Sequence, residues 1–246
     1  WITTKMPDSH WMTEARLKGT KVVVVTVEYS ATASKADEVV VIRPGTDPAF
    51  ALGIAQQLIA RELYDREWVL KNTDLPFLIR LDTLEPLRPS DLSADYTNQT
   101  PANVDVLAKG EKAPSGLKHK RQMVDDGVAA QLVPGMIWDS SAGRPVAMTR
   151  DGVGTSPNGI ALRAAKKVTL ASGQEVEVRT HFELLEQYLN ANLTPEQTSK
   201  ITCAPAKTLV ALAEAIAANP EKTMFATGMG PNQFFNRDKK DRDTML

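Results

Sequence analysis

The sequence predicts an α/β fold: an open, largely parallel sheet with flanking helices, interrupted by an irregular insertion. Three observations lead to this class. Residues 21–27 contain five valines, a second apolar run at 39–42 follows a short crossover, and a helix that begins beside a proline comes next. Helix, strand, crossover, strand and helix in this order are typical of an open α/β sheet.

The first predicted elements are a helix at 9–18 and the valine-rich strand. Ser9 or Asp8 can cap this helix, and Gly19 follows it as a residue able to adopt the left-handed conformation. Valine suits a pleated strand because its β-branched side chain is stiff at χ1. The run also lacks polar alternation, so we expect a central strand that is buried on both faces.

A helix over 49–63 is predicted after the second strand. The preceding segment reads Arg43-Pro44-Gly45-Thr46-Asp47-Pro48. Asp47 is a good N-cap, and Pro48 suits the first helical position because its missing N–H would have had no partner there.

Regular patterning is lost over 84–165, where prolines, glycines and polar residues dominate apart from a short strand predicted at 136–138. This stretch is either a small subdomain or a long surface insertion. Beyond it we expect a hairpin with strands at 166–170 and 175–179 that turns at Ser172-Gly173. Helices are expected at 181–189, from 194–196 onward and at 205–218, followed by a strand at 224–226 and a helix that starts near Phe234. We therefore divide the chain into 1–83, 84–165 and 166–246.

Composition excludes several classes. The chain has 246 residues, is 42% hydrophobic and carries a formal net charge of -1, and its densest basic cluster, 118–121, has no interleaved aromatic residue, so we expect no nucleic-acid partner. Its single cysteine, Cys203, excludes an internal disulfide and an iron–sulfur cluster with four ligands from this chain alone. Cys203 lies between two predicted helices, where we expect a half-buried packing thiol.

Three candidate binding loops follow predicted strands, and ligands of open parallel sheets bind beyond the carboxyl ends of strands. Glu28 can accept hydrogen bonds from ribose hydroxyls, whereas a solvated turn residue is the plainer interpretation. Gly45, Thr46 and Asp47 open a helix whose N–H groups favour phosphate, and Asp47 is either a helix cap or a bidentate acceptor for guanine. Gly228 and Gly230 would let the backbone approach a bound group closely.

Several segments together resemble the catalytic subunits of the dimethyl sulfoxide reductase superfamily, nearest to membrane-associated nitrate reductases and nitrite oxidoreductases. They are residues 5–11 (KMPDSHW), 13–21 (TEARLKGTK), 36–37 (AD) with 43–47 (RPGTD), 73–78 (TDLPFL) and 228–235 (GMGPNQFF). The resemblance covers nearly the whole chain. It implies a Rossmann-like domain that binds one of two molybdopterin guanine dinucleotides of a molybdenum cofactor.

The resemblance also implies a role for each candidate residue. Glu28 would contact the ribose, Thr46 and Asp47 would hold phosphate and guanine, and the loop from Gly228 through Gly230 to Asn232 would line the pterin or its pyrophosphate. The molybdenum ligand and the iron–sulfur ligands would lie upstream of Trp1, so no catalytic or metal residue is assigned here. We expect a segment of a longer protein that is inactive alone.

The implied parent is a molybdopterin-dependent oxidoreductase that transfers an oxygen atom to or from a small oxyanion. The run 230–236 favours nitrite oxidoreductase, with respiratory nitrate reductase or a selenate or (per)chlorate reductase as alternatives. A non-catalytic nucleotide-binding module is the alternative outside this class. The implied partners are an iron–sulfur beta subunit and a membrane-anchoring gamma subunit, with the side of the membrane left open.

Overall fold

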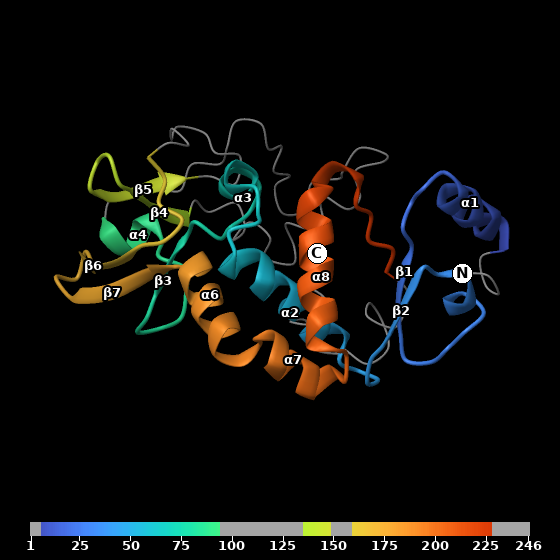
Figure 1. Ribbon diagram of the computed structural model, residues 1–246. Coiled ribbons are helices and arrows are strands. Elements are labelled where there is room, and N and C mark those ends of the chain that lie inside the picture. Colours follow the sequence, from blue (N-terminus) through green and yellow to red (C-terminus); the bar gives the residue numbers. More distant parts are fainter. Residues whose placement is uncertain (1–5, 94–134, 149–158, 228–246) are drawn as a thin grey trace, which may run out of the picture. The chain divides into compact units, whose positions relative to one another are not determined.

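A computed structural model describes residues 6–93, 135–148 and 159–227 of the chain, which combine helices with small open sheets (Figure 1). The chain divides into two compact units. Unit 1 comprises Trp1–Tyr64 together with Glu186–Leu246, and unit 2 comprises Asp65–Leu185. The α/β class predicted from the sequence is confirmed, and the candidate residues from the first part of the chain all fall in unit 1.

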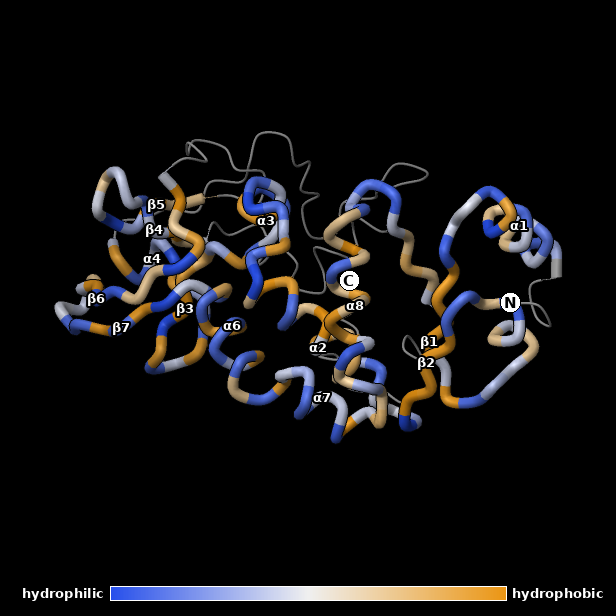
Figure 2. Tube along the Cα trace, in the orientation of Figure 1, coloured by the Kyte–Doolittle hydropathy of each residue, from blue (hydrophilic) through white to orange (hydrophobic). Residues whose placement is uncertain are grey.

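Unit 1 is built around one parallel pair of strands, β1 (Val23–Thr26) and β2 (Glu38–Val41). Their register runs from Val23 opposite Glu38 to Thr26 opposite Val41. The helices of this unit are α1 (Met6–Leu17), α2 (Asp47–Ala60), α7 (Pro195–Thr202) and α8 (Ala206–Ala218), with short 3-10 turns at Ala33–Lys35 and Pro220–Lys222; α6 covers His181–Asn192. Residues 23–25 of β1 and 39–41 of β2 are hydrophobic valines (Figure 2).

The core of unit 1 forms where β2 meets helices from both ends of the sequence. Val40, Ile42 and Phe50 are buried together with Ala204 and Leu209. Burying such side chains stabilises the unit by roughly 1.5–3 kcal/mol for each large one. The loop after β2 is therefore held against the segment that joins α7 to α8.

Two strand predictions in unit 1 are wrong. β1 pairs only with β2 in the described residues, and Val25 and Val27 are 41% and 49% exposed, so β1 is not a central strand buried on both faces. Residues 224–226 form no strand, and Met224 and Phe225 are 81% and 69% exposed. An apolar run predicts a strand, but a strand also needs a neighbour to pair with its N–H and C=O groups.

The predicted helices that fall in the described residues are confirmed, several with shifted starts, whereas the helix predicted to start near Phe234 lies outside the described residues. α1 begins at Met6, so Asp8 and Ser9 lie inside it rather than capping it, while Gly19 has the expected positive φ of 94°. α7 begins after Thr194, whose side chain accepts from the N–H of Gln197 while the Gln197 side chain accepts from the N–H of Thr194. This reciprocal pair satisfies two helix N–H groups that would otherwise lack acceptors.

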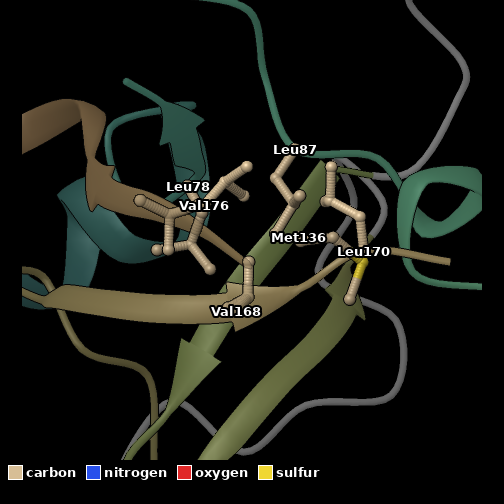
Figure 3. Packing of buried hydrophobic residues seen from close by; sticks show 7 residues of the cluster. Leu78, Leu87, Met136, Val168, Leu170 and Val176 are labelled. Atoms are coloured by element: carbon tan, nitrogen blue, oxygen red, sulfur yellow. The ribbon is translucent and has the colours of Figure 1, made fainter. Parts of the chain in front are cut away.

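Unit 2 contains two antiparallel sheets. β3 (Leu78–Arg80), β7 (Glu175–Thr180) and β6 (Ala165–Thr169) form one, and β4 (Gly135–Asp139) pairs with β5 (Arg144–Met148) in the other; α3 (Arg66–Asn72) and α4 (Pro89–Leu92) complete the unit. Leu78, Met136 and Val176 belong to the apolar cluster that these strands share (Figure 3). The β6–β7 hairpin and the strand at 136–138 are confirmed.

The prediction of a single, largely parallel sheet is wrong for the described residues. Of the four registered strand pairs, β1–β2 is parallel, whereas β3–β7, β4–β5 and β6–β7 are antiparallel. Short apolar runs do not reveal their partners, because strand direction depends on connections that a period-2 pattern does not encode. The three-segment division 1–83, 84–165 and 166–246 stays a prediction.

Candidate functional site

The parallel pair places two of the predicted loops at one end of unit 1. Thr26 is opposite Val41 at the carboxyl ends of β1 and β2, and the N–H of Ile42 donates to the carbonyl oxygen of Thr26 at 2.8 Å. Glu28 follows β1, and residues 43–47 follow β2. We call Glu28 and residues 43–47 the carboxyl rim. Parallel strands end at the same edge, so the rim gathers residues from both loops.

Glu28 is exposed in a turn that its own backbone stabilises. The hydroxyl of Thr26 donates to the carbonyl oxygen of Glu28 at 2.9 Å, and the N–H of Ser30 donates to the same oxygen at 3.1 Å. Within the described ranges, the Glu28 carboxylate has neither a hydrogen bond nor an ion pair. Its acceptor oxygens are therefore available to hydroxyl donors such as those of a ribose.

Residues 43–46 form a tight turn, and the hydrogen bonds that Thr46 donates stay within this turn. Both the N–H and the hydroxyl of Thr46 donate to the carbonyl oxygen of Arg43, at 3.2 and 2.7 Å. Gly45 has φ of 77°, and a Cβ added there would meet no atom within 4 Å. Gly45 is thus required for its left-handed backbone and not for lack of space.

Asp47 occupies a different position from the one predicted. It is the first residue of α2, while Thr46 is the N-cap and makes no side-chain capping bond. The prediction of Asp47 as the N-cap is therefore wrong, because the turn closes one residue earlier. In the described residues the half-buried Asp47 carboxylate accepts no hydrogen bond, which leaves the guanine-acceptor hypothesis intact.

The start of α2 supplies free backbone donors beside this carboxylate. The first helical bond there runs from the N–H of Phe50 to the carbonyl oxygen of Thr46 at 3.0 Å. Across the part of unit 1 that the structure describes, the N–H groups of Gly45, Asp47 and Ala49 have no acceptor. Unpaired N–H groups and the helix dipole favour an anion at such an end.

A segment that the sequence did not assign to the site also reaches the carboxyl rim. The N–H of Arg43 donates to the carbonyl oxygen of Thr202 at 2.7 Å, and its guanidinium donates to the sulfur of Cys203 at 3.3 Å. Cys203 is exposed and has φ of 66°, so the expectation of a half-buried packing thiol is wrong. The pattern Thr-Cys-Ala-Pro after a helix marks a helix end but gives no indication of this distant contact.

The remaining predicted site residues, Gly228, Gly230 and Asn232, lie outside the described residues. Whether their loop shares a rim with Glu28 and Asp47 stays a prediction. In the described ranges, no three His, Cys, Asp or Glu side chains gather as metal ligands would. None of the helices described is by itself long and apolar enough to cross a bilayer, although α7 and α8, bent by 116°, meet that criterion together.

Comparison with known proteins finds relatives over nearly the whole chain. The alpha subunit of perchlorate reductase from Dechloromonas aromatica is 31% identical over 96% of the chain, and the alpha subunit of respiratory nitrate reductase from Haloferax mediterranei is 29% identical over 99%. The alpha subunit of chlorate reductase from Ideonella dechloratans is 35% identical over 44% of the chain. No family model matches. The chain spans about a quarter of the first two subunits, 24% and 22% of their lengths.

Proposed function

Because the chain belongs to the dimethyl sulfoxide reductase superfamily of molybdopterin oxidoreductases, we propose that it binds the guanosine end of a molybdopterin guanine dinucleotide. The parent protein is then the catalytic alpha subunit of a molybdenum enzyme, with two such dinucleotides on the metal. An iron–sulfur cluster in the parent completes its cofactors. The designation of the relatives as alpha subunits supports an assembly with further subunits.

The observation that carries this proposal is the pair of unpaired carboxylates on the carboxyl rim. Asp47 at the start of α2 presents two acceptor oxygens, and guanine offers a matching pair of donors at N1 and the exocyclic amine. Glu28 presents acceptors for ribose hydroxyls from the end of β1. The free N–H groups at the start of α2 favour the phosphates. These donor and acceptor types fit a guanosine diphosphate group.

The bound cofactor supplies oxygen-atom transfer, and this chain binds and orients it. The carboxylates that accept hydrogen bonds from the base and the ribose determine the orientation of the nucleotide. Backbone N–H groups in fixed positions bind its phosphates without further ordering. The protein also sets the electrostatic environment of the cofactor.

The proposed substrate is a small oxyanion, because the relatives are named for perchlorate, nitrate and chlorate. Within this class we propose nitrite oxidation to nitrate, supported by the residue run 230–236. Nitrate reduction is supported equally by the relatives' names, and selenate or (per)chlorate reduction is the next alternative. The proposed partners are an iron–sulfur beta subunit and a membrane-anchoring gamma subunit.

Nucleoside binding to the 246-residue chain tests the site. Guanosine is expected to bind more tightly than inosine, which lacks the 2-amino group, and inosine more tightly than adenosine, which lacks both the 2-amino group and the N1–H. Asp47→Asn should remove most of this selectivity, because an amide cannot accept with both of its atoms. Losing one charge-assisted hydrogen bond costs about 1.5–3 kcal/mol, or roughly tenfold or more in affinity.

Glu196→Gln is the matched control, because Glu196 is likewise a carboxylate in the first turn of a helix of unit 1, although it is more exposed than Asp47. It should leave the selectivity unchanged. Equal affinity for guanosine and adenosine in calorimetric titrations of the wild-type chain would refute the guanine site. In the full-length enzyme, rates with nitrite, nitrate, perchlorate and selenate then separate the oxyanion alternatives, and no turnover of any of them favours a non-catalytic module.

A further inference from the structure

The phosphates of a guanosine diphosphate group need donors, and the hydroxyl of Thr46 does not provide one. A carbonyl oxygen can only accept, so the 2.7 Å contact between this hydroxyl and the Arg43 carbonyl commits the hydroxyl proton to that bond. The N–H of Thr46 is committed to the same oxygen. The two side chains with free oxygens on the rim, Glu28 and Asp47, are acidic and repel phosphate. A cation is therefore needed to balance them.

Arg43 is the cation that the rim itself contains. Its guanidinium is exposed, and in the described ranges it forms no ion pair with a carboxylate; its partner is the sulfur of Cys203. A thiol sulfur is a weak acceptor, so a phosphate can replace it at little cost. Arginine is also suited to this role because its planar fork donates to two phosphate oxygens at once.

The backbone of Arg43 is held on both sides, which fixes the point on the rim from which its side chain extends. Its N–H donates to Thr202, and its carbonyl oxygen accepts twice from Thr46. Thr202 is fully buried, its hydroxyl donates to the carbonyl oxygen of Thr198 at 2.8 Å, and the N–H of Ala204 donates to that hydroxyl at 3.2 Å. The end of α7 thus anchors a residue that lies far away in the sequence.

We propose that Arg43 binds the diphosphate of the nucleotide, and that the Thr46 hydroxyl holds the turn instead. This inference rests on the proposed function and adds a specificity: the rim selects a nucleotide over the corresponding nucleoside. Cys203 accepts from the guanidinium when no phosphate is bound. A phosphate then takes the place of the sulfur.

The test compares guanosine with guanosine diphosphate on the 246-residue chain. The wild-type chain should bind the diphosphate at least about tenfold more tightly. Arg43→Ala should lose most of that preference while its affinity for guanosine changes less than about twofold, and Arg43→Lys should retain part of it because lysine remains a point charge.

Arg61→Ala is the matched control. It removes the same charge from the other end of α2, where Arg61 pairs with Glu214 at 2.8 Å, and it should preserve the preference. An equal loss of both ligands in Arg43→Ala would make Arg43 merely structural and overturn the inference. If the wild-type chain binds guanosine and its diphosphate equally, the inference fails while the guanosine site stands. If it binds neither, the proposed function fails as well.

Discussion

Asp37 shows how one side chain can join three elements of unit 1. The guanidinium of Arg16 in α1 donates to both carboxylate oxygens of Asp37, with Nε at 3.0 and 3.1 Å. The N–H of Val22 donates to the same carboxylate at 2.8 Å. Asp37 precedes β2 directly, so it holds α1 and the start of β1 against that strand.

These contacts predict a pH dependence. The hydrogen bonds from Arg16 and then Val22 hold the pKa of Asp37 below its usual range. A lowered folded-state pKa means that the carboxylate stabilises the fold above its unfolded pKa of about 3.9, and that this contribution is lost as the pH falls further through the folded value. The protection factor for hydrogen exchange at the Val22 amide should therefore fall below about pH 4.

Asp37→Asn provides the comparison for this prediction. Asparagine can still accept from Val22, but it has no proton to gain in this range, so the acid-dependent step should disappear and exchange at neutral pH should be faster. A variant that shows the same acid step as wild type would assign the effect to another group. Both residues of the Arg16–Asp37 pair are about one-third exposed, so the effect is local.

Gly53 determines how closely two helices of unit 1 approach each other. A Cβ added to this α2 residue would lie 2.6 Å from Cγ2 and 2.7 Å from Oγ1 of Thr198 in α7. Thr198 is fully buried, and its hydroxyl donates to the carbonyl oxygen of Leu193 at 3.1 Å. The side chain therefore has no open space into which it could move.

Gly53→Ala is expected to destabilise the chain. Overpacking costs typically about 1–3 kcal/mol, and the contacts here predict the upper part of that range. Alanine regains about 1 kcal/mol through its higher helix propensity, so the net loss should be about 1–2 kcal/mol in urea unfolding. The double variant with Thr198→Ala should lose less than the sum of the two single variants. Simple additivity would mean that the two residues do not touch.

At the scale of the whole molecule, we expect activity to require more than this chain. The first two relatives are about four times longer, and the family resemblance implies that the metal ligands lie in segments other than residues 1–246. We therefore expect the purified chain to bind no molybdenum stably and to reduce no dye with nitrite. The full-length enzyme is the positive control, and nitrite-dependent dye reduction by the 246-residue chain would contradict the expectation.

The division into two units brings site residues that are far apart in the sequence into the same unit. Glu28, Asp47 and Cys203 all belong to unit 1, although the last follows a long excursion of the chain through unit 2. In the sequence, unit 2 separates residues 43–47 from the junction between α7 and α8. In the structure, hydrogen bonds from Arg43 join these two segments.

The sequence by itself determined the features whose signals lie within a few residues. Examples are the helix start at 194–196, the Ser172-Gly173 hairpin and the left-handed Gly19. It also determined that Glu28 and Asp47 follow two strands that are consecutive in the sequence. Local signals suffice for these because hydrogen bonds in caps and turns join residues only two to four positions apart.

Only the tertiary structure decided the pairings between distant segments. It showed that β1 has one partner, that three of the four strand pairs are antiparallel, and that residues 224–226 have no strand to join in the described chain. It also brought Cys203 to Arg43 across 160 positions and occupied the donors of Thr46. No local pattern encodes these contacts, because they depend on packing between segments that are far apart in the sequence, such as β3 with β7 in unit 2 and β2 with α2 and α8 in unit 1.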